Sequence, residues 1–233
     1  PVKVVASGVA QIAAGSNHSL FLKSDGSLWA MGHNVGQLGD GTTNNRPNPV
    51  QVVDGNVTAV AAGYRHSLFL KSDGSLWAMG FNSYGQLGDG TGTQRTSPVQ
   101  VVASGVVQVA AGYYHSLFLK SDGSLWAMGY NGNGQLGLNG VPTGYGDEAN
   151  VRELRAVAVP GEAAQVACGW GHTFVVTASG ALLGWGKNHK GQLGLGHRHR
   201  QSLPQPVPLP AGALRVAGVG GTARNICVLA VLG

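Results

Sequence analysis

The fifteen-residue string HSLFLKSDGSLWAMG occurs three times without a change, at His18–Gly32, His66–Gly80 and His115–Gly129. A fourth, more divergent copy, HTFVVTASGALLGWG, spans His172–Gly186. The first histidines of successive copies are 48, 49 and 57 residues apart. A repeat of about 50 residues is typical of an array of one supersecondary unit, in which each unit packs on its neighbours. We therefore expect function on a surface that several repeats share.

The second repeat, residues 57–102, shows what one unit contains. Two apolar segments flank the turn Ser72-Asp73-Gly74, and Asp-Gly predicts a hairpin because tight turns with positive φ favour these residues. A Gly- and Thr-rich loop at 81–97 precedes a last strand, PVQVV, and a first strand, VTAVAAG, opens the unit. No segment has helical periodicity. The sequence predicts an all-β protein with four short strands per repeat and no helices.

Four short strands in a repeat of this length favour a β-propeller built from four-stranded antiparallel blades. The GQLG leucines are expected to fill the gaps between blades. Both chain ends resemble strands of the repeat, so we expect them to assemble a partial fifth blade, in a closed five-bladed ring or an open arc. The predicted single domain, 1–233, has blades at about 10–53, 57–102, 106–159 and 164–209, with the partial blade from 213–233 and 1–5.

The order of these motifs resembles the regulator of chromosome condensation repeat family, with repeats of bacterial type in the first half. Each GQLG follows an asparagine, and each of the four histidines precedes Ser or Thr. The resemblance implies a β-propeller, usually of seven blades, so four complete repeats suggest a truncated parent. The first three repeats have Met where the family has Trp, with a Trp two residues earlier. We interpret this as a compensated exchange in the core, at Met31, Met79 and Met128.

Composition limits the classes of function. Of the 233 residues, 43% are hydrophobic and 11% charged, and no apolar stretch is long enough for a membrane span. No signal peptide is visible, so we favour a cytoplasmic location, although a chain that begins with Pro1 is expected to be a fragment or a processed product. Cys168 and Cys227 lie in apolar runs and are expected to be buried thiols. The oligomeric state stays open.

Identical residues at identical places in each repeat indicate structure, because an enzyme gathers unlike groups at one centre. We therefore expect the four repeated histidines to have a structural role, such as a hydrogen bond from the ring to a neighbouring backbone. No nucleophile and base or metal-ligand pattern stands out. We expect no catalytic residues, no metal and no cofactor.

The two residues before each histidine vary between repeats and include aromatic residues and arginine. Equivalent turns of successive blades lie on one face, and aromatic residues with arginine are enriched at protein interfaces. An ordinary exposed loop is the alternative interpretation. The predicted partner-binding residues are Tyr64, Arg65, Tyr113, Tyr114 and Trp170.

Residues 161–233 contain six of the basic residues and one acidic residue, so the formal charge of +5 lies there. The loop at 189–200 is rich in His and Arg, which predicts either a solvated loop or contact with an anionic partner. An insertion at 138–151 lengthens the corresponding loop of the third repeat and suits recognition. The expected anionic-partner contacts are Lys187, Lys190, Arg198 and Arg200.

The leading hypothesis is a non-enzymatic protein-interaction module that binds a partner protein through loops on one face. The resemblance supplies an alternative, a guanine nucleotide exchange factor for a small GTPase. A further alternative is chromatin or nucleic-acid contact through the basic last third, which lacks the interleaved aromatic residues that support base stacking.

Overall fold

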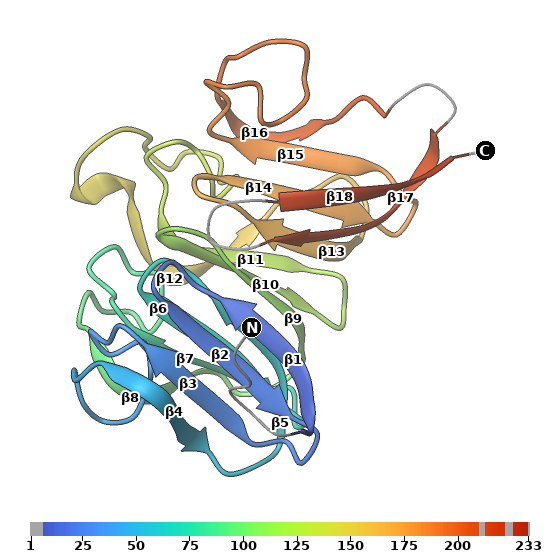
Figure 1. The fold of residues 1–233 in the computed structure, drawn as a ribbon. Helices are drawn as coiled ribbons and strands as arrows, with labels where there is room; N and C mark the ends of the chain where they lie inside the picture. The colour runs from blue at the N-terminus through green and yellow to red at the C-terminus, as the bar shows by residue number, and fades with distance from the viewer. Residues whose placement is uncertain (1–6, 210–212, 222–225, 233) are drawn as a thin grey trace.

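The computed structural model describes residues 7–209 in full and the backbone of residues 213–221 and 226–232. The described strands form four four-stranded antiparallel sheets and one two-stranded sheet, which confirms the predicted all-β propeller architecture (Figure 1). Each four-stranded sheet is one blade, and its strands are ordered as they occur in the chain. One short helix departs from the prediction, because the insertion contains a single 3-10 turn, η1 (Asp147–Ala149).

The blades have closely similar strand lengths. Blade 1 contains β1 (Val9–Ala14), β2 (His18–Lys23), β3 (Leu28–Gly32) and β4 (Arg46–Val53). Blade 2 contains β5 (Val57–Ala62), β6 (His66–Lys71), β7 (Leu76–Gly80) and β8 (Arg95–Val102). Blade 3 contains β9 (Val106–Ala111), β10 (His115–Lys120), β11 (Leu125–Tyr130) and β12 (Asn150–Val157). Blade 4 contains β13 (Ala163–Cys168), β14 (His172–Thr177), β15 (Leu182–Gly186) and β16 (Gln201–Pro206), and β17 (Ala213–Gly221) and β18 (Ile226–Leu232) form the last hairpin.

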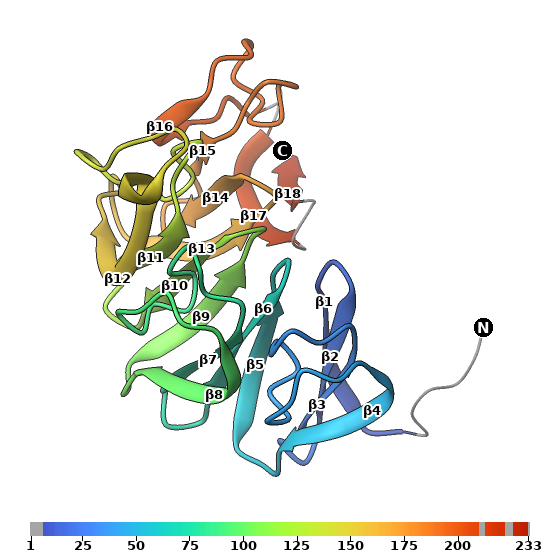
Figure 2. The ribbon, with the colours of Figure 1, turned by 90° about the vertical axis from the view of Figure 1, so that its left-hand side faces the viewer.

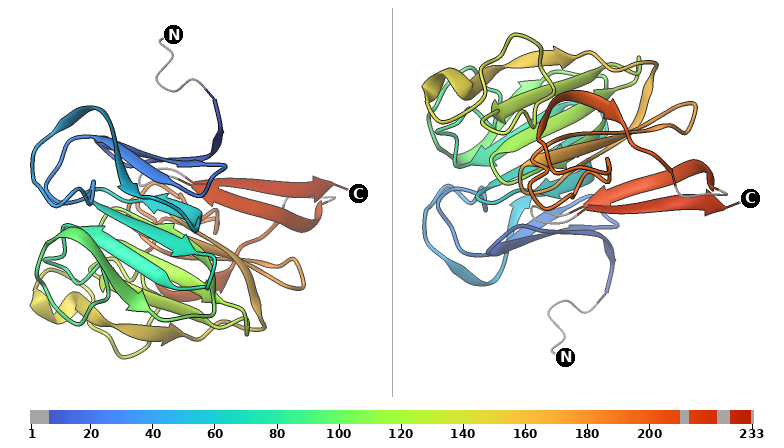
Figure 3. Two further views of the ribbon diagram at one scale, coloured as in Figure 1. Left: turned by 90° about the horizontal axis from the view of Figure 1, so that it is seen from below. Right: turned by 90° about the horizontal axis from the view of Figure 1, so that it is seen from above.

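The first strands of the blades line the centre of an arc, because β1 contacts β5, β5 contacts β9, β9 contacts β13 and β13 contacts β17 (Figures 2 and 3). The hairpin β17–β18 supplies two strands of the predicted partial blade. The segment Pro1–Val5, predicted to join it, lies outside the described residues. Within the described part of the chain no blade packs against β1 on the side opposite β5, and Ile12 of β1 is 76% exposed. No helix in this part is long and apolar enough to cross a membrane.

The repeated hairpin forms around its Asp-Gly turn as predicted. In blade 2, Gly74 has φ of 75°, and the backbone N–H of Ser75 donates to Asp73 Oδ1 at 2.9 Å. The ring of Trp77 stacks on Phe69 at a centroid distance of 6.1 Å, and its Nε1 donates to Ser75 Oγ at 2.9 Å. Trp77 is partly buried and packs against the core cluster that contains Met79, so it lies at the edge of the predicted core.

The other part of the exchange holds in blades 2 and 3, where the methionine fills the space between blades, whereas Met31 of blade 1 is only partly buried. Met79 and Met128 are fully buried, as is Trp185, which has the equivalent place in blade 4. The GQLG leucines are buried beside them as predicted, at Leu38, Leu87, Leu136 and Leu193. Cys168 is a buried free thiol, and burial raises its pKa. The side chain of Cys227 lies outside the described residues.

The repeated histidines join successive blades. His18 Nε2 lies 3.0 Å from Ser67 Oγ of blade 2, and the same bond joins His66 to Ser116 at 2.9 Å. Ser67 Oγ donates its hydrogen to the carbonyl oxygen of Gln37 at 2.8 Å, so it accepts a hydrogen from His18 Nε2. The structural role is as predicted, although the partner is a hydroxyl rather than a backbone group. The third joint contains His115, Thr173 and Gln135.

These histidines are neutral at neutral pH. Burial lowers the pKa of His66 and of His115 to about 3, and of His18 and His172 to about 4, because a charged ring is poorly solvated there. Nδ1 of all four is buried without a hydrogen-bond partner. A proton on Nδ1 would therefore have no acceptor.

Each blade's long loop is fixed by an asparagine. Asn82 is fully buried, its Nδ2 donates to Asp89 Oδ1 at 2.9 Å and to the carbonyl of Thr91 at 3.1 Å, and its Oδ1 accepts from the backbone N–H of Leu87 at 3.0 Å. Asp89 in turn accepts from Arg95 Nε at 2.7 Å. The GQLG loop is thus positioned by buried hydrogen bonds at both of its ends.

Substitution Asn82→Ala is expected to lower the free energy of unfolding by about 3 kcal/mol, because it leaves buried groups without partners. Equilibrium denaturation with guanidinium chloride measures the change. The matched control is Asn139→Ala at an exposed position, which is expected to change little. Equal unfolding midpoints for the two variants would contradict the importance of the asparagine.

Candidate functional site

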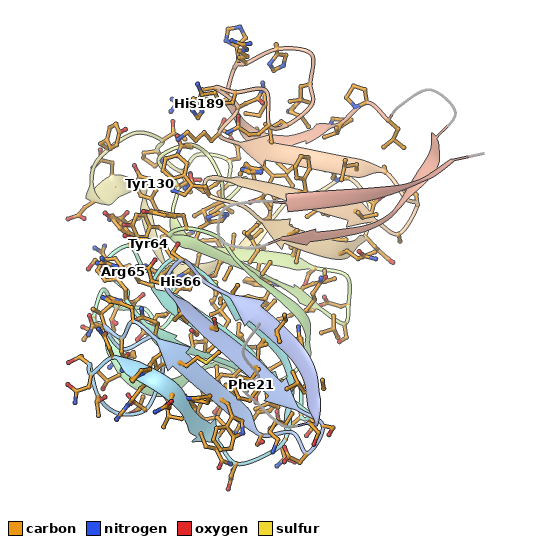
Figure 4. All side chains as sticks on the ribbon, in the orientation of Figure 1. Phe21, Tyr64, Arg65, His66, Tyr130 and His189 are labelled. Carbon is orange, nitrogen blue, oxygen red and sulfur yellow. The ribbon has the colours of Figure 1, made fainter. Side chains whose placement is uncertain are left out.

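The variable residues before the histidines of blades 2, 3 and 4 come together, on the side of the propeller where Figure 4 shows Tyr64 and Arg65. The rings of Tyr64 and Tyr113 stack with centroids 4.0 Å apart and planes 17° from parallel. Tyr113 also contacts Trp170 at 5.4 Å and Tyr114 at 4.5 Å, both edge to face. The guanidinium of Arg65 lies 5.0 Å from the centre of the Tyr64 ring. All five predicted partner-binding residues therefore share one surface, contributed by blades 2, 3 and 4.

Two more tyrosines extend this cluster: Tyr84 comes from the long loop of blade 2, and Tyr130 comes from the end of β11. Tyr84 lies 4.6 Å from Tyr114 and 5.2 Å from Tyr130, measured between ring centroids. The sequence prediction missed both residues. They occupy the position before GQLG and the position after the hairpin's last glycine, which vary between repeats just as the residues before the histidines do. Variation at fixed places in an otherwise constant repeat was the signal that would have found them.

Below these rings is a pocket with a volume of about 780 Å³, within the range of about 300–1,000 Å³ usual for ligand sites. Blades 2, 3 and 4 and the insertion all contribute to its walls. We call it the aromatic pocket. Its lining residues are Tyr84, Tyr113, Tyr114, Tyr130, Gly132, Asn133, Gln135, Gly144, Tyr145, Gly146, Asp147, Asn150, Trp170, Lys187 and Arg200.

Two of the four basic residues predicted to contact an anionic partner line the same pocket. Lys187 Nζ lies 3.2 Å from the centre of the Trp170 ring, a cation–π contact. Arg200 crosses from blade 4 to blade 3 and donates from Nη1 to the carbonyl oxygen of Gly132 at 3.2 Å. Lys190 and Arg198 are exposed and do not line the pocket. The predicted aromatic residues therefore share one site with Lys187 and Arg200, two of the four predicted basic residues.

Burial shifts the acid–base behaviour of the pocket. It lowers the pKa of Lys187 and is the largest cause of the raised pKa values of Tyr114 and Tyr130. Neighbouring tyrosines add to the shift of Tyr114. The phenols therefore keep their hydrogens at neutral pH and serve as hydrogen-bond donors.

The insertion forms one wall of the pocket. Tyr130 Oη donates to the carbonyl oxygen of Gly144 at 3.1 Å, which ties the insertion to β11. Asn150 Nδ2 donates to Asp147 Oδ1 at 2.9 Å, while Asn150 Oδ1 is buried without a hydrogen-bond partner. Tyr145 is almost fully exposed. The insertion therefore adds both polar groups and an exposed aromatic ring to the rim.

Repeated four-stranded blades joined by buried histidines, with variable residues gathered on one face, define a repeat β-propeller. The RCC1-like domain family matches residues 1–227, and the chain belongs to this family. The predicted resemblance is confirmed.

Curated relatives match in short segments. The human protein HERC4, a probable E3 ubiquitin-protein ligase, is 52% identical over 40 residues, which is 17% of this chain and 4% of HERC4. Human HERC3, also a probable E3 ubiquitin-protein ligase, is 42% identical over 59 residues, which is 25% of this chain and 5% of HERC3. The matched segment is thus a small fraction of each relative.

Solved structures match over nearly the whole chain. Human WBSCR16 is 26% identical with a TM-score of 0.80, covering 95% of this chain and 59% of its own. Prp20p from Saccharomyces cerevisiae, described together with its binding to Gsp1p and histones, is 24% identical with a TM-score of 0.86, covering 100% of this chain and 58% of its own. The likeness to Prp20p shows the fold, and this chain spans less than two thirds of either protein.

Proposed function

We propose that this chain is a non-enzymatic protein-interaction module that binds a partner protein through the aromatic pocket and the rings around it. The observation that supports this function is the meeting of aromatic side chains from three blades, on a framework whose other repeated positions are constant. Large amphipathic rings in a preformed hollow are what protein-binding hot spots are made of. The description of Prp20p as a binder of Gsp1p and histones is consistent with this use of the fold.

The test is affinity capture of partners from cells of the source organism, with purified protein as bait. The combined variant Tyr64→Ala, Tyr113→Ala and Trp170→Ala is expected to reduce the captured partner at least about tenfold, because hot-spot rings each contribute about 2 kcal/mol or more. The matched control combines Ile12→Ala, Val107→Ala and Leu203→Ala, which are exposed apolar residues outside the pocket. Equal capture by the two combined variants would place the binding surface elsewhere.

A nucleotide-release assay with a panel of small GTPases separates this proposal from the alternative of guanine nucleotide exchange. The interaction module is expected to leave the release rate at its uncatalysed level. Accelerated release that disappears in the Tyr64, Tyr113 and Trp170 variant would assign the pocket to exchange instead. Accelerated release that the variant keeps would show a second active surface.

A further inference from the structure

We propose that the aromatic pocket recognises an acidic peptide segment of the partner protein, with a peptide carboxylate set against Lys187 and Arg200. This inference rests on the proposed function and names the chemistry of its ligand. It draws together the cations, the unpartnered acceptor and the arrangement of the rings.

The pocket carries positive charge that the described residues do not neutralise. Among these residues, neither Lys187 nor Arg200 has a carboxylate within ion-pair distance. Lys187 is instead held over the Trp170 ring, and Arg200 uses one of its N–H groups on the carbonyl of Gly132. The ammonium and the rest of the guanidinium stay available to a ligand. A carboxylate that approaches both would form charge-assisted hydrogen bonds in a half-enclosed site.

The acidic residue on the lining does not cancel this charge. Asp147 accepts from Asn150 Nδ2 at 2.9 Å, and its carboxylate lies 3.7 Å from the guanidinium of Arg152. Its side chain is 89% exposed at the rim. Arg152 compensates Asp147, so the two cations on the other wall define the charge that an incoming ligand meets.

A buried acceptor favours a peptide over a simple anion. Asn150 lines the pocket, and its Oδ1 is buried without a hydrogen-bond partner. A buried acceptor without a donor costs about 1–3 kcal/mol, and a ligand N–H that reaches Asn150 Oδ1 after a small rotation of this side chain would recover part of that cost. A peptide brings backbone N–H groups together with side-chain carboxylates. The dianion of a phosphate monoester brings acceptors only and would leave Asn150 Oδ1 without a donor.

The arrangement of the rings argues against stacking of nucleic-acid bases. Single-stranded nucleic acid binds where aromatic faces are open to the bases and a basic groove follows the backbone. Here Tyr64 and Tyr113 stack on each other, and Lys187 covers a face of Trp170. The other predicted cations, Lys190 and Arg198, lie outside the pocket rather than in a groove that continues it. The observations therefore favour a peptide.

The test selects binders from a phage library of random peptides on the intact protein. Selected peptides are expected to be enriched in Asp and Glu beside an apolar or aromatic residue. Fluorescence polarisation of one labelled selected peptide then measures affinity. Variant Lys187→Glu is expected to weaken binding at least about tenfold, and Arg200→Gln about threefold or more. The matched controls Lys190→Glu and Arg198→Gln make the same changes of charge outside the pocket and are expected to stay within about twofold.

A charge exchange gives a second measurement that does not depend on loss of binding. The selected peptide with its acidic residues changed to Lys is expected to bind the Lys187→Glu variant better than the unchanged protein. Thermal melting of each variant confirms that it is folded. Failure of the exchange with a folded variant would overturn the assignment of Lys187.

The remaining outcomes separate this inference from the proposed function. Selected peptides that are basic or uncharged, yet lose binding in the Tyr64, Tyr113 and Trp170 variant, would overturn the acidic ligand and leave the interaction module standing. Enrichment of no sequence would overturn the peptide ligand. Binding of labelled oligo(dT) that weakens in Lys187→Glu would assign the pocket to nucleic acid. Equal partner capture by the two combined variants described above would overturn the function itself.

Discussion

Lowering the pH from 7.5 to 5.0 is expected to remove about 8 kcal/mol from the free energy of unfolding. The four buried histidines have pKa values of about 3 to 4 in the folded state, against about 6.5 in an unfolded chain. Above pH 6.5 they are neutral in both states and favour neither. As the pH falls from 6.5 to 4, the histidines of the unfolded chain bind protons, whereas those of the folded chain stay neutral. The free energy of unfolding therefore decreases as the pH is lowered. Each histidine contributes about 2 kcal/mol to this loss.

Guanidinium denaturation at a series of pH values measures this loss, and one variant identifies its source. His66→Gln keeps an N–H donor near Ser116 and cannot titrate, so the fall in stability between pH 7.5 and 5.0 is expected to shrink by about a quarter. His197→Gln, in an exposed loop, is the matched control and is expected to keep the full pH dependence. If His66→Gln and the unchanged protein lose stability in parallel, the buried histidines are not the cause.

Substitution Gly63→Ala is expected to cost about 3 kcal/mol of stability and to lower the melting temperature by about 6–12 °C. A Cβ at this position would lie within van der Waals overlap of the His66 ring and 2.6 Å from the carbonyl oxygen of Gly112. Neither can move freely, because His66 is bonded to Ser116 and Gly112 belongs to the next blade. The expected cost is steric, since the backbone of Gly63 is not in the left-handed region.

The matched control for this clash is Gly55→Ala, where the nearest atom to a new Cβ is a backbone oxygen 4.0 Å away. This variant is expected to melt within about 2 °C of the unchanged protein, because an alanine in open space changes little. Differential scanning calorimetry measures both variants. Similar melting temperatures for Gly63→Ala and Gly55→Ala would show that blade 3 shifts enough to accommodate the added methyl group.

The repeat made the architecture predictable, whereas the details of side-chain contact were not. Strand alternation and the Asp-Gly turn locate the hairpins without knowledge of the neighbouring blades. The partner of His66 was not predictable, because Ser116 lies 50 residues away and meets the ring only when the blades pack. The partial burial of Trp77 was not predictable, because residues two apart on a strand share a face but not the same burial.

The candidate site was predictable where its signal lay beside a recognised motif. Tyr64, Tyr113 and Trp170 precede the histidines and were identified from that position. Tyr84, just before GQLG, and Tyr130, at the end of β11, also stand at positions that vary between repeats, but these positions lie apart from the histidine motif and were not identified. That Lys187 shares a pocket with Tyr113 depends on the angle between two blades, which is a property of the packed arc and not of either repeat.

The three identical hairpins have a consequence for how the chain reaches this fold. Nothing within their fifteen residues distinguishes one sheet from another, so a hairpin exchanged between blades 1, 2 and 3 would meet a first strand of similar sequence, β1, β5 or β9. Correct order is left to connectivity: residues 54–56 link blade 1 to blade 2, and residues 103–105 link blade 2 to blade 3. Such short links give each hairpin a far higher local concentration near its own neighbours than near distant ones. Short links, rather than differences between side chains, therefore determine which blade each identical hairpin joins.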